Sequence, residues 1–226
     1  MAPDTTSKQR HFTEELAELK RRLLAMGGLA EERVRLAVRG LVERDANVLS
    51  DVITGDDELN KFHVEIDDRC FKLLALHQPM AGDLRTIVAV VKINNDLERV
   101  GDLAVNIAEA AQRYVSHPPV KPLVDIPRMA TLAQSMLHDS LDAFVTGDQQ
   151  MARHVLDRDD TLDELKSQVF RELLTYMLGD PRTIEPGIDL ILVSRHLERI
   201  GDHATNLAED VIFIVAALDV RHHSVE

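Results

Sequence analysis

The chain has almost none of the residues that build disulfide-linked or thiolate-metal proteins, and it has few aromatic side chains. Tryptophan is absent, aromatic residues make up 4% of its 226 residues, and Cys70 is its single cysteine. One cysteine can form neither a disulfide framework nor a thiolate zinc site. We therefore expect Cys70 to pack as a small apolar residue.

Long hydrophobic segments are also missing. The longest apolar run, VIFIVAAL at residues 211–218, is far shorter than the roughly 20 residues that a membrane-spanning helix needs. The polar N-terminus, MAPDTTSKQR, has no apolar signal core. These features predict a cytoplasmic protein with no transmembrane segment.

Positive charge is scarce. The chain has 26 lysines and arginines against 39 aspartates and glutamates, which gives a formal net charge of −13. Nucleic-acid binding depends largely on neutralisation of phosphates by lysine and arginine, so the composition argues against a nucleic-acid partner. An acidic chain instead attracts cations or basic partner surfaces.

The sequence has little of the alternation that β-strands need and much leucine, alanine, glutamate and arginine, which predicts an all-α fold. Asp45 and Asp148 are good N-cap residues for two short helices. Apolar residues at helical spacing and the breaks between them predict eight helices, at about 12–44, 46–53, 58–75, 84–114, 126–146, 149–157, 161–178 and 188–218.

A proline-rich segment, SHPPVKP at residues 116–122, divides the chain into halves with the same helix order. Each half runs long helix, short helix, helix, proline-bearing break, long helix. We predict two tandem antiparallel three-helix bundles related by pseudo-twofold symmetry. The first is placed at residues 1–116 and the second at 123–226, with a linker at 117–122.

One acidic segment occurs in both halves, as LERVGDLAVNIAE at residues 97–109 and LERIGDHATNLAE at 197–209. Glu98 with Asp102, and Glu198 with Asp202, are i,i+4 pairs that share a helix face and repel each other unless a cation bridges them. Such rows of oxygen ligands suit Mg, Ca, Mn or Fe, and Zn less well. The repeated pairs predict two metal sites.

Two observations leave a simpler reading of this segment open. The acidic residues could form a solvated face that Arg99 or Arg199 neutralises, and gene duplication by itself accounts for part of the identity.

Gly101 and Gly201 each cost a helix interior roughly 1 kcal/mol relative to alanine. Their recurrence predicts that a neighbouring helix or a cluster of ions approaches the backbone there.

These two segments resemble the signature of the PhoU family, as do LLAMGGLAEE at 23–32 and HQPMAGDLR at 77–85. The resemblance covers essentially the whole chain. It implies two three-helix bundles, a homodimer, and multinuclear iron or zinc sites on the helix faces that carry E-x-x-x-D. The ligands that it implies are Glu98, Asp102, Glu198 and Asp202.

The resemblance also implies a regulatory function with no catalysis. Family members link the phosphate ABC transporter, through its ATP-binding subunit, to a phosphate-sensing histidine kinase, and so repress the phosphate-starvation response and limit uptake. The second half has GDPRTIEPG at residues 179–187 in place of HQPMAGDLR, so we expect partner contacts through this break in the first half.

Some residues depart from the repeat or have a second reading. His196 and His203 replace Asp96 and Leu103, so the second metal site could differ in its ligands, although each histidine could equally be a surface or interface residue. Asp57 and Asp160 stand at the start of the third and seventh predicted helices. Each could cap its helix or reach the repeated acidic pair of its own half.

Two alternative functions remain. A ferritin-like di-iron enzyme would need Glu-x-x-His motifs, and no glutamate in the chain has a histidine three residues later. A metal-free helical scaffold could use its acidic stripes to dock a basic partner. No cationic pocket can be read from the sequence, so direct phosphate binding is not predicted.

Overall fold

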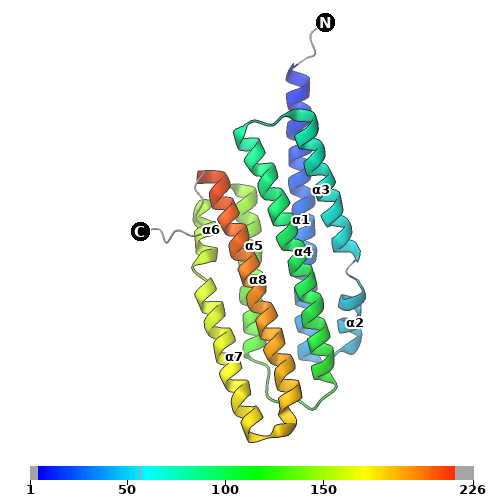
Figure 1. Cartoon of the computed structure of the whole chain (residues 1–226), viewed down its shortest axis with the longest axis vertical. Coiled ribbons are helices and arrows are strands. Elements are labelled where there is room, and N and C mark those ends of the chain that lie inside the picture. Colours follow the sequence, from blue (N-terminus) through cyan, green and yellow to red (C-terminus); the bar gives the residue numbers. More distant parts are fainter. Residues whose placement is uncertain (1–4, 56, 217–226) are drawn as a thin grey trace.

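The structure is a computed structural model that describes residues 5–55 and 57–216. Within these residues every regular element is helical, as predicted (Figure 1). The elements are α1 Thr5–Glu43, α2 Ala46–Thr54, α3 Asp57–His77, α4 Ala81–Val115, α5 Asp125–Thr146, α6 Gln149–Leu156, α7 Asp159–Gly179, the 3-10 turn η1 Pro181–Thr183, and α8 Ile184–Ala216.

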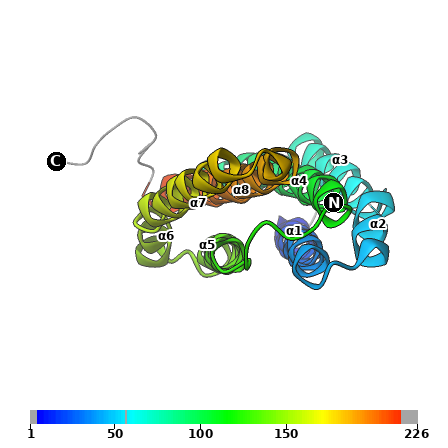
Figure 2. The same cartoon turned by 90° about the horizontal axis from the view of Figure 1, so that it is seen from below.

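The six long helices form two layers, which are clearest along the helix axes in Figure 2. One layer contains α3, α4, α8 and α7 in that order, and the other contains α1 and α5 with the short helices α2 and α6 at its edges. Helices α1, α3 and α4 come from the first half of the chain, and α5, α7 and α8 from the second. Each half is thus a three-helix unit, and α4 and α8 lie side by side where the units meet.

The two predicted caps are confirmed. The Asp45 carboxylate accepts hydrogen bonds from the backbone N–H groups of Asn47 and Val48 at the start of α2. Asp148 does the same for Gln150 and Met151 at the start of α6. Both caps satisfy N–H groups that have no partner within the helix, and they fix the turn between two helices at the same place in each half.

The breaks before α4 and α8 are shorter than the sequence predicts. Only residues 78–80 separate α3 from α4. Helix α8 begins at Ile184 and includes Pro186 in its first turn, where the missing N–H would have no helical partner in any case. The predicted C-terminal end of this helix, residue 218, lies outside the described residues.

The expectation that Asp160 caps its helix is wrong. Helix α7 begins one residue earlier, at Asp159, and its N-cap is Arg158. Asp160 is therefore inside the first turn, where a negative charge still interacts favourably with the helix dipole. Asp57 is likewise the first residue of α3, not a residue before it.

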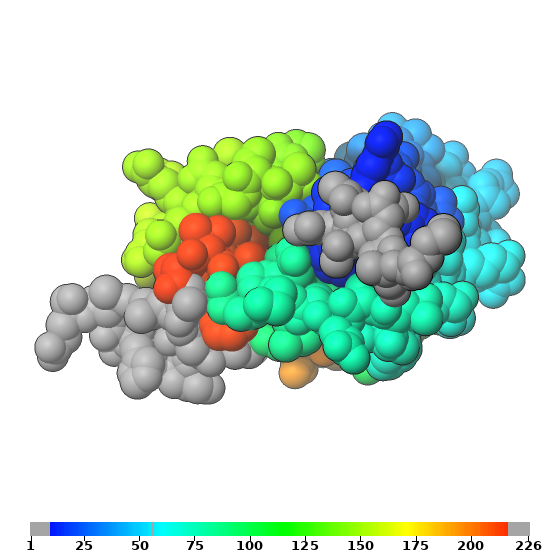
Figure 3. All heavy atoms as spheres, turned by 90° about the horizontal axis from the view of Figure 1, so that it is seen from above, coloured from blue at the N-terminus to red at the C-terminus, as the bar shows by residue number. Residues whose placement is uncertain are grey.

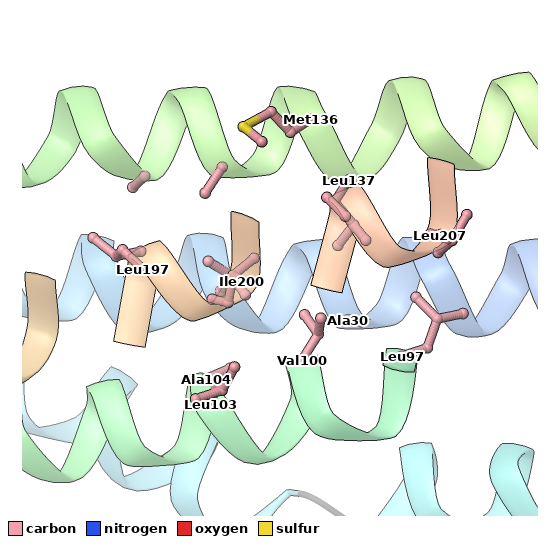
Figure 4. Close-up of a cluster of buried hydrophobic side chains, with 14 of the residues drawn as sticks. Ala30, Leu97, Val100, Leu103, Ala104, Met136, Leu137, Leu197, Ile200 and Leu207 are labelled. Carbon is pink, nitrogen blue, oxygen red and sulfur yellow. The ribbon is translucent and has the colours of Figure 1, made fainter. Parts of the chain in front are cut away.

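A single cluster of buried apolar side chains runs through both units. Figure 4 shows part of it, with Ala30 from α1, Val100 from α4, Met136 from α5 and Ile200 from α8 facing one another. Cys70 is completely buried in the same cluster, and burial raises the pKa of its thiol to about 12. Its expected role as an apolar filler is confirmed. The unit boundaries at 116 and 123 stay predictions.

Polar pairs join α4 to α8 across the apolar seam. His203 Nδ1 lies 2.8 Å from Asp96 Oδ1, which makes His203 an interface residue. Two further pairs involve buried carboxylates, Arg113 Nε–Asp189 Oδ1 at 2.8 Å and Lys92 Nζ–Asp210 Oδ1 at 2.9 Å. The pairs show that α4 and α8 are antiparallel. The end view in Figure 3 accordingly has the start of α4 beside the end of α8.

The repeated glycines allow close packing within each unit. A Cβ atom built on Gly101 would lie 3.0 Å from the side chain of Leu59 in α3, and one on Gly201 would lie 2.4 Å from that of Leu162 in α7. Both leucines are fully or almost fully buried. A neighbouring helix, the first of the two causes that the sequence suggested, therefore accounts for both glycines.

The two glycines should respond differently to alanine. For Gly201→Ala we expect a loss of about 1 kcal/mol in the free energy of unfolding, because overpacking costs roughly 1–3 kcal/mol and the gain in helix propensity offsets about 1 kcal/mol. Gly101→Ala, with the longer contact, should be nearly neutral. Urea denaturation measures both.

Gly28→Ala is the matched control, because nothing lies within 4 Å of a Cβ atom built there. This variant should gain about 1 kcal/mol in stability from helix propensity. If Gly201→Ala were as stable as Gly28→Ala, the packing explanation of the repeated glycine would be wrong.

Candidate metal centre

The second unit brings together four carboxylates, two of which the sequence analysis did not assign. Glu198 and Asp202 lie on α8, as predicted, and Asp159 and Asp163 come from the adjacent α7. Leu162 packs on Gly201, and this contact sets the register that places Asp159 and Asp163 beside the pair on α8. We call Asp159, Asp163, Glu198 and Asp202 the acidic cluster.

Mutual repulsion within the acidic cluster is visible in two pKa values. Burial, followed by the charges of Asp163, Asp160 and Glu198, raises the pKa of Asp159 above its usual range. Burial and then the charges of Glu198, Asp159 and Asp163 raise the pKa of Asp202. The positive charges that act on them, that of Lys166 on Asp159 and that of His203 on Asp202, compensate only in part for burial and for the neighbouring carboxylates.

Lys166 occupies the centre of the acidic cluster. Its Nζ atom lies 2.7 Å from Asp163 Oδ1 and 2.7 Å from Glu198 Oε1. These hydrogen bonds raise the pKa of the lysine, so it stays protonated. The residue that neutralises Glu198 thus comes from the neighbouring helix α7 and is not Arg199 of the same helix.

The first unit has a weaker set of candidate ligands. Arg99 lies close to both predicted ligands, 3.6 Å from Glu98 Oε2 and 3.3 Å from Asp102 Oδ2. The alignment of Leu59 with Leu162 puts Asn60 where the second unit has Asp163, and His63 where it has Lys166. The predicted neutralisation by arginine thus occurs in this unit.

Among residues 5–55 and 57–216, no three histidine, cysteine, aspartate or glutamate side chains are gathered closely enough to hold a metal ion as they stand. The acidic cluster nevertheless has the right chemistry for an oxygen-preferring cation. Lys166 is partly exposed and has a flexible side chain, so a cation could take its place between Asp163 and Glu198. The residues fit a metal that displaces Lys166.

Neither histidine of the second repeat is a member of the acidic cluster, although the charge of His203 partly offsets the raised pKa of Asp202. His203 pairs with Asp96, and His196 has a buried Nδ1 atom with no hydrogen-bond partner among the described residues. Burial and the charges of nearby arginines, first Arg199 and then Arg195, lower the pKa of His196. Asp160 is not a member of the cluster, but its charge contributes to the raised pKa of Asp159.

The sequence does contain a signal for the missed ligands. Asp159 and Asp163 form an i,i+4 pair, like Glu198 with Asp202. The sequence alone could not show whether Asp159 or Asp160 faces α8, because one residue of helix register rotates a side chain by about 100°. The position of Lys166 depends on the same register.

Comparison with known proteins defines the class of the molecule, a two-repeat helical protein of phosphate transport. The PhoU domain family matches the chain twice, over residues 23–111 and 126–211. The chain belongs to the PhoU family, whose members are regulatory or accessory proteins and not enzymes. Membership rules out the ferritin-like enzyme alternative.

Individual relatives are similar over almost their full length. The PhoU homologue of Caulobacter vibrioides, a phosphate-specific transport system accessory protein, is 46% identical over 203 residues, covering 89% of this chain and 88% of its own. The homologue of Aquifex aeolicus is 42% identical over 212 residues, covering 94% of this chain and 96% of its own.

Solved structures of the family have the same fold. The crystal structure of PhoU from Pseudomonas aeruginosa matches with a TM-score of 0.88 and 39% identity, covering 92% of this chain and 100% of that one. The regulatory protein PhoU from Streptococcus pneumoniae matches with a TM-score of 0.85 and 28% identity, covering 92% and 99%. Across the described part of the chain, no helix combines the length and apolarity needed to cross a membrane.

The raised pKa values predict how stability depends on pH in metal-stripped protein. A carboxyl group with a raised pKa in the folded state binds its proton more tightly there than in the unfolded chain, so ionisation at neutral pH destabilises the fold. Asp202→Asn should therefore be more stable than the parent at neutral pH. This advantage should shrink as pH falls through the raised pKa. Thermal melts between neutral and mildly acidic pH measure it.

Asp180→Asn provides a control of opposite sign. Arg182 lowers the pKa of Asp180, so this variant should be less stable than the parent at neutral pH and approach it as the carboxyl group is protonated at low pH. A stability difference for Asp202→Asn that does not change with pH would contradict the raised pKa of Asp202.

Proposed function

We propose that this chain represses the phosphate-starvation response and restrains phosphate uptake, by linking the ATP-binding subunit of the phosphate ABC transporter to a phosphate-sensing histidine kinase. The observation that carries the proposal is the match of both repeats, over nearly the whole chain, to phosphate-specific transport system accessory proteins. Such a function needs binding surfaces and no catalytic residues. We also propose that the protein acts as a homodimer, which light scattering would test.

An exposed apolar tip supports partner binding by the first unit. Leu76 at the end of α3 is 72% exposed, and Met80 in the short break before α4 is 79% exposed. Leu84 and Val88 continue this surface along α4. Apolar side chains concentrated at one exposed place are typical of a protein interface. We propose that this tip, residues 76–88, contacts the kinase or the transporter.

We further propose that the acidic cluster binds a divalent metal ion through Asp159, Asp163, Glu198 and Asp202. An all-oxygen ligand set favours manganese or iron over zinc. The pair Glu98 and Asp102 forms the corresponding site in the first unit, and it should bind more weakly because Arg99 neutralises both residues and Asn60 replaces an acidic ligand.

A metal-free scaffold is the second candidate, and one observation favours it. Lys166 and Arg99 already neutralise three of the four ligands predicted from the sequence. In this case the acidic faces would serve only to attract a basic partner surface, and the repeated segment would be explained by packing of its glycines.

Calorimetric titration of chelator-treated, untagged protein with Mn²⁺ distinguishes the metal site from the metal-free scaffold. Metal binding predicts that Lys166→Met increases affinity about tenfold or more, because it removes a positive charge that competes with the ion. The double variants Asp159→Asn with Asp163→Asn, and Glu198→Ala with Asp202→Ala, should lose the stronger site. Glu98→Ala with Asp102→Ala should affect only the weaker one.

Lys72→Met is the matched control, since Lys72 pairs with a single exposed carboxylate on α3, that of Asp68. It should bind Mn²⁺ like the parent protein. The scaffold reading predicts no stoichiometric binding in any variant, and that result would overturn the metal proposal.

Genetics tests the regulatory function. Deletion of the gene should leave phosphate-starvation genes expressed in phosphate-rich medium, as a reporter fusion measures. Complementation with Leu76→Ser and Met80→Ser should fail although the protein folds, because the exposed tip would have lost its apolar side chains. A deletion strain without a paralogue that still represses these genes would refute the proposal.

Leu178→Ser is the control for the tip variant. Leu178 is 80% exposed but ends α7, at the opposite end of the molecule (Figure 1). It should complement the deletion. Failure of both variants to complement would argue against a contact specific to the first unit.

A further inference from the structure

Helices α7 and α8 border an open cavity of about 700 Å³ next to the acidic cluster. Arg171 of α7 and Arg195 and Arg199 of α8 line it, together with the apolar side chains of Phe170 and Ile191. Its remaining charged wall consists of Lys166 and of two members of the acidic cluster, Glu198 and Asp202. The sequence did not reveal this cationic pocket, because its arginines come from two helices.

The three arginines are available to a ligand. None of Arg171, Arg195 and Arg199 forms an ion pair with any carboxylate in residues 5–55 and 57–216, whereas Arg99, the counterpart of Arg199 in the first unit, pairs with Glu98 and Asp102. In a chain with a net charge of −13, three such arginines around one cavity form a local centre of positive charge. This centre would attract an anion.

The first unit does not share this arrangement. With Leu59 aligned to Leu162 and Gly101 to Gly201, the counterparts of Phe170 and Arg171 are Asp67 and Asp68, and that of Arg195 is Asn95. Acidic or neutral residues in one repeat are thus apolar or basic in the other. Phe170, Arg171 and Arg195 are exposed, so packing of the core does not require the difference.

We propose that this cavity binds the phosphoryl group of a small phosphate, inorganic or organic. Guanidinium groups match phosphoryl oxygens with paired, charge-assisted hydrogen bonds, and the hydroxyl group of Ser167 lies in the same wall. The volume falls in the usual range for small-molecule sites. Phe170 is 48% exposed and offers a ring to an organic ligand such as a nucleotide.

The inference goes beyond the proposed regulatory function and needs no metal ion. Lys166 neutralises Glu198, so the arginine side of the cavity can bind an anion without a bound cation. Binding by chelator-treated protein therefore tests the cavity alone, and a failure of the metal proposal would leave that result unchanged.

Calorimetry and ³¹P NMR on the full chain test the proposal with three probes, inorganic phosphate, AMP and ATP. We expect at least one probe to bind at a single site. Arg171→Gln with Arg195→Gln should weaken that binding by about a hundredfold, since each of the two lost charge-assisted bonds costs about tenfold or more. A preference for AMP or ATP would identify an organic phosphate, and tighter binding of the inorganic ion would identify free phosphate.

The matched control is Arg128→Gln with Arg153→Gln, which removes two exposed arginines outside the cavity and gives the same net charge. It should bind like the parent protein. Three results would overturn the proposal. They are no binding of any probe at millimolar concentration, equal weakening by the control, and equally tight binding of citrate, which would indicate attraction to charge alone.

Discussion

The antiparallel contact between α4 and α8 is the constraint on which the rest of the structure depends. Both helices are buried along the seam, with Leu97 and Val100 on one side and Leu197 and Ile200 on the other. Each then supports a middle helix of its own unit, through the contacts of Leu59 with Gly101 and Leu162 with Gly201. Every charged side chain on α3 and α7 is therefore positioned relative to α4 and α8 by these close contacts.

The fold could be predicted from the sequence largely because local signals agree with it. Asp45 and Asp148 cap their helices as the sequence indicates, and the two acidic segments revealed the repeat. The start of α8 was misjudged because Pro186 is tolerated in a first turn. The candidate site was only half predictable, since the positions of Asp159 and Lys166 depend on which face of α7 meets α8, and this is decided by packing between helices.

Charge balance differs between the two units and gives them different chemistry. In the first, Arg99 folds back on its own helix and neutralises Glu98 and Asp102. In the second, Lys166 from the neighbouring helix takes over the pairing with Glu198, which leaves Arg199 without a carboxylate partner among the described residues. One arginine in the same place in both repeats thus serves as an internal counterion in one and lines an open cavity in the other.

The polar pairs between α4 and α8 also determine which surfaces can associate. Each pair exists once, because the internal symmetry places apolar residues at the equivalent positions, for example Leu103 and Ala110 where α8 has His203 and Asp210. If α4 met a second α4 in the same way, Asp96 and Lys92 would face Leu103 and Ala110. Their charges would lose their partners on burial, which is unfavourable. The charged residues of the two repeats therefore favour pairing of α4 with α8 over pairing of α4 with a second α4.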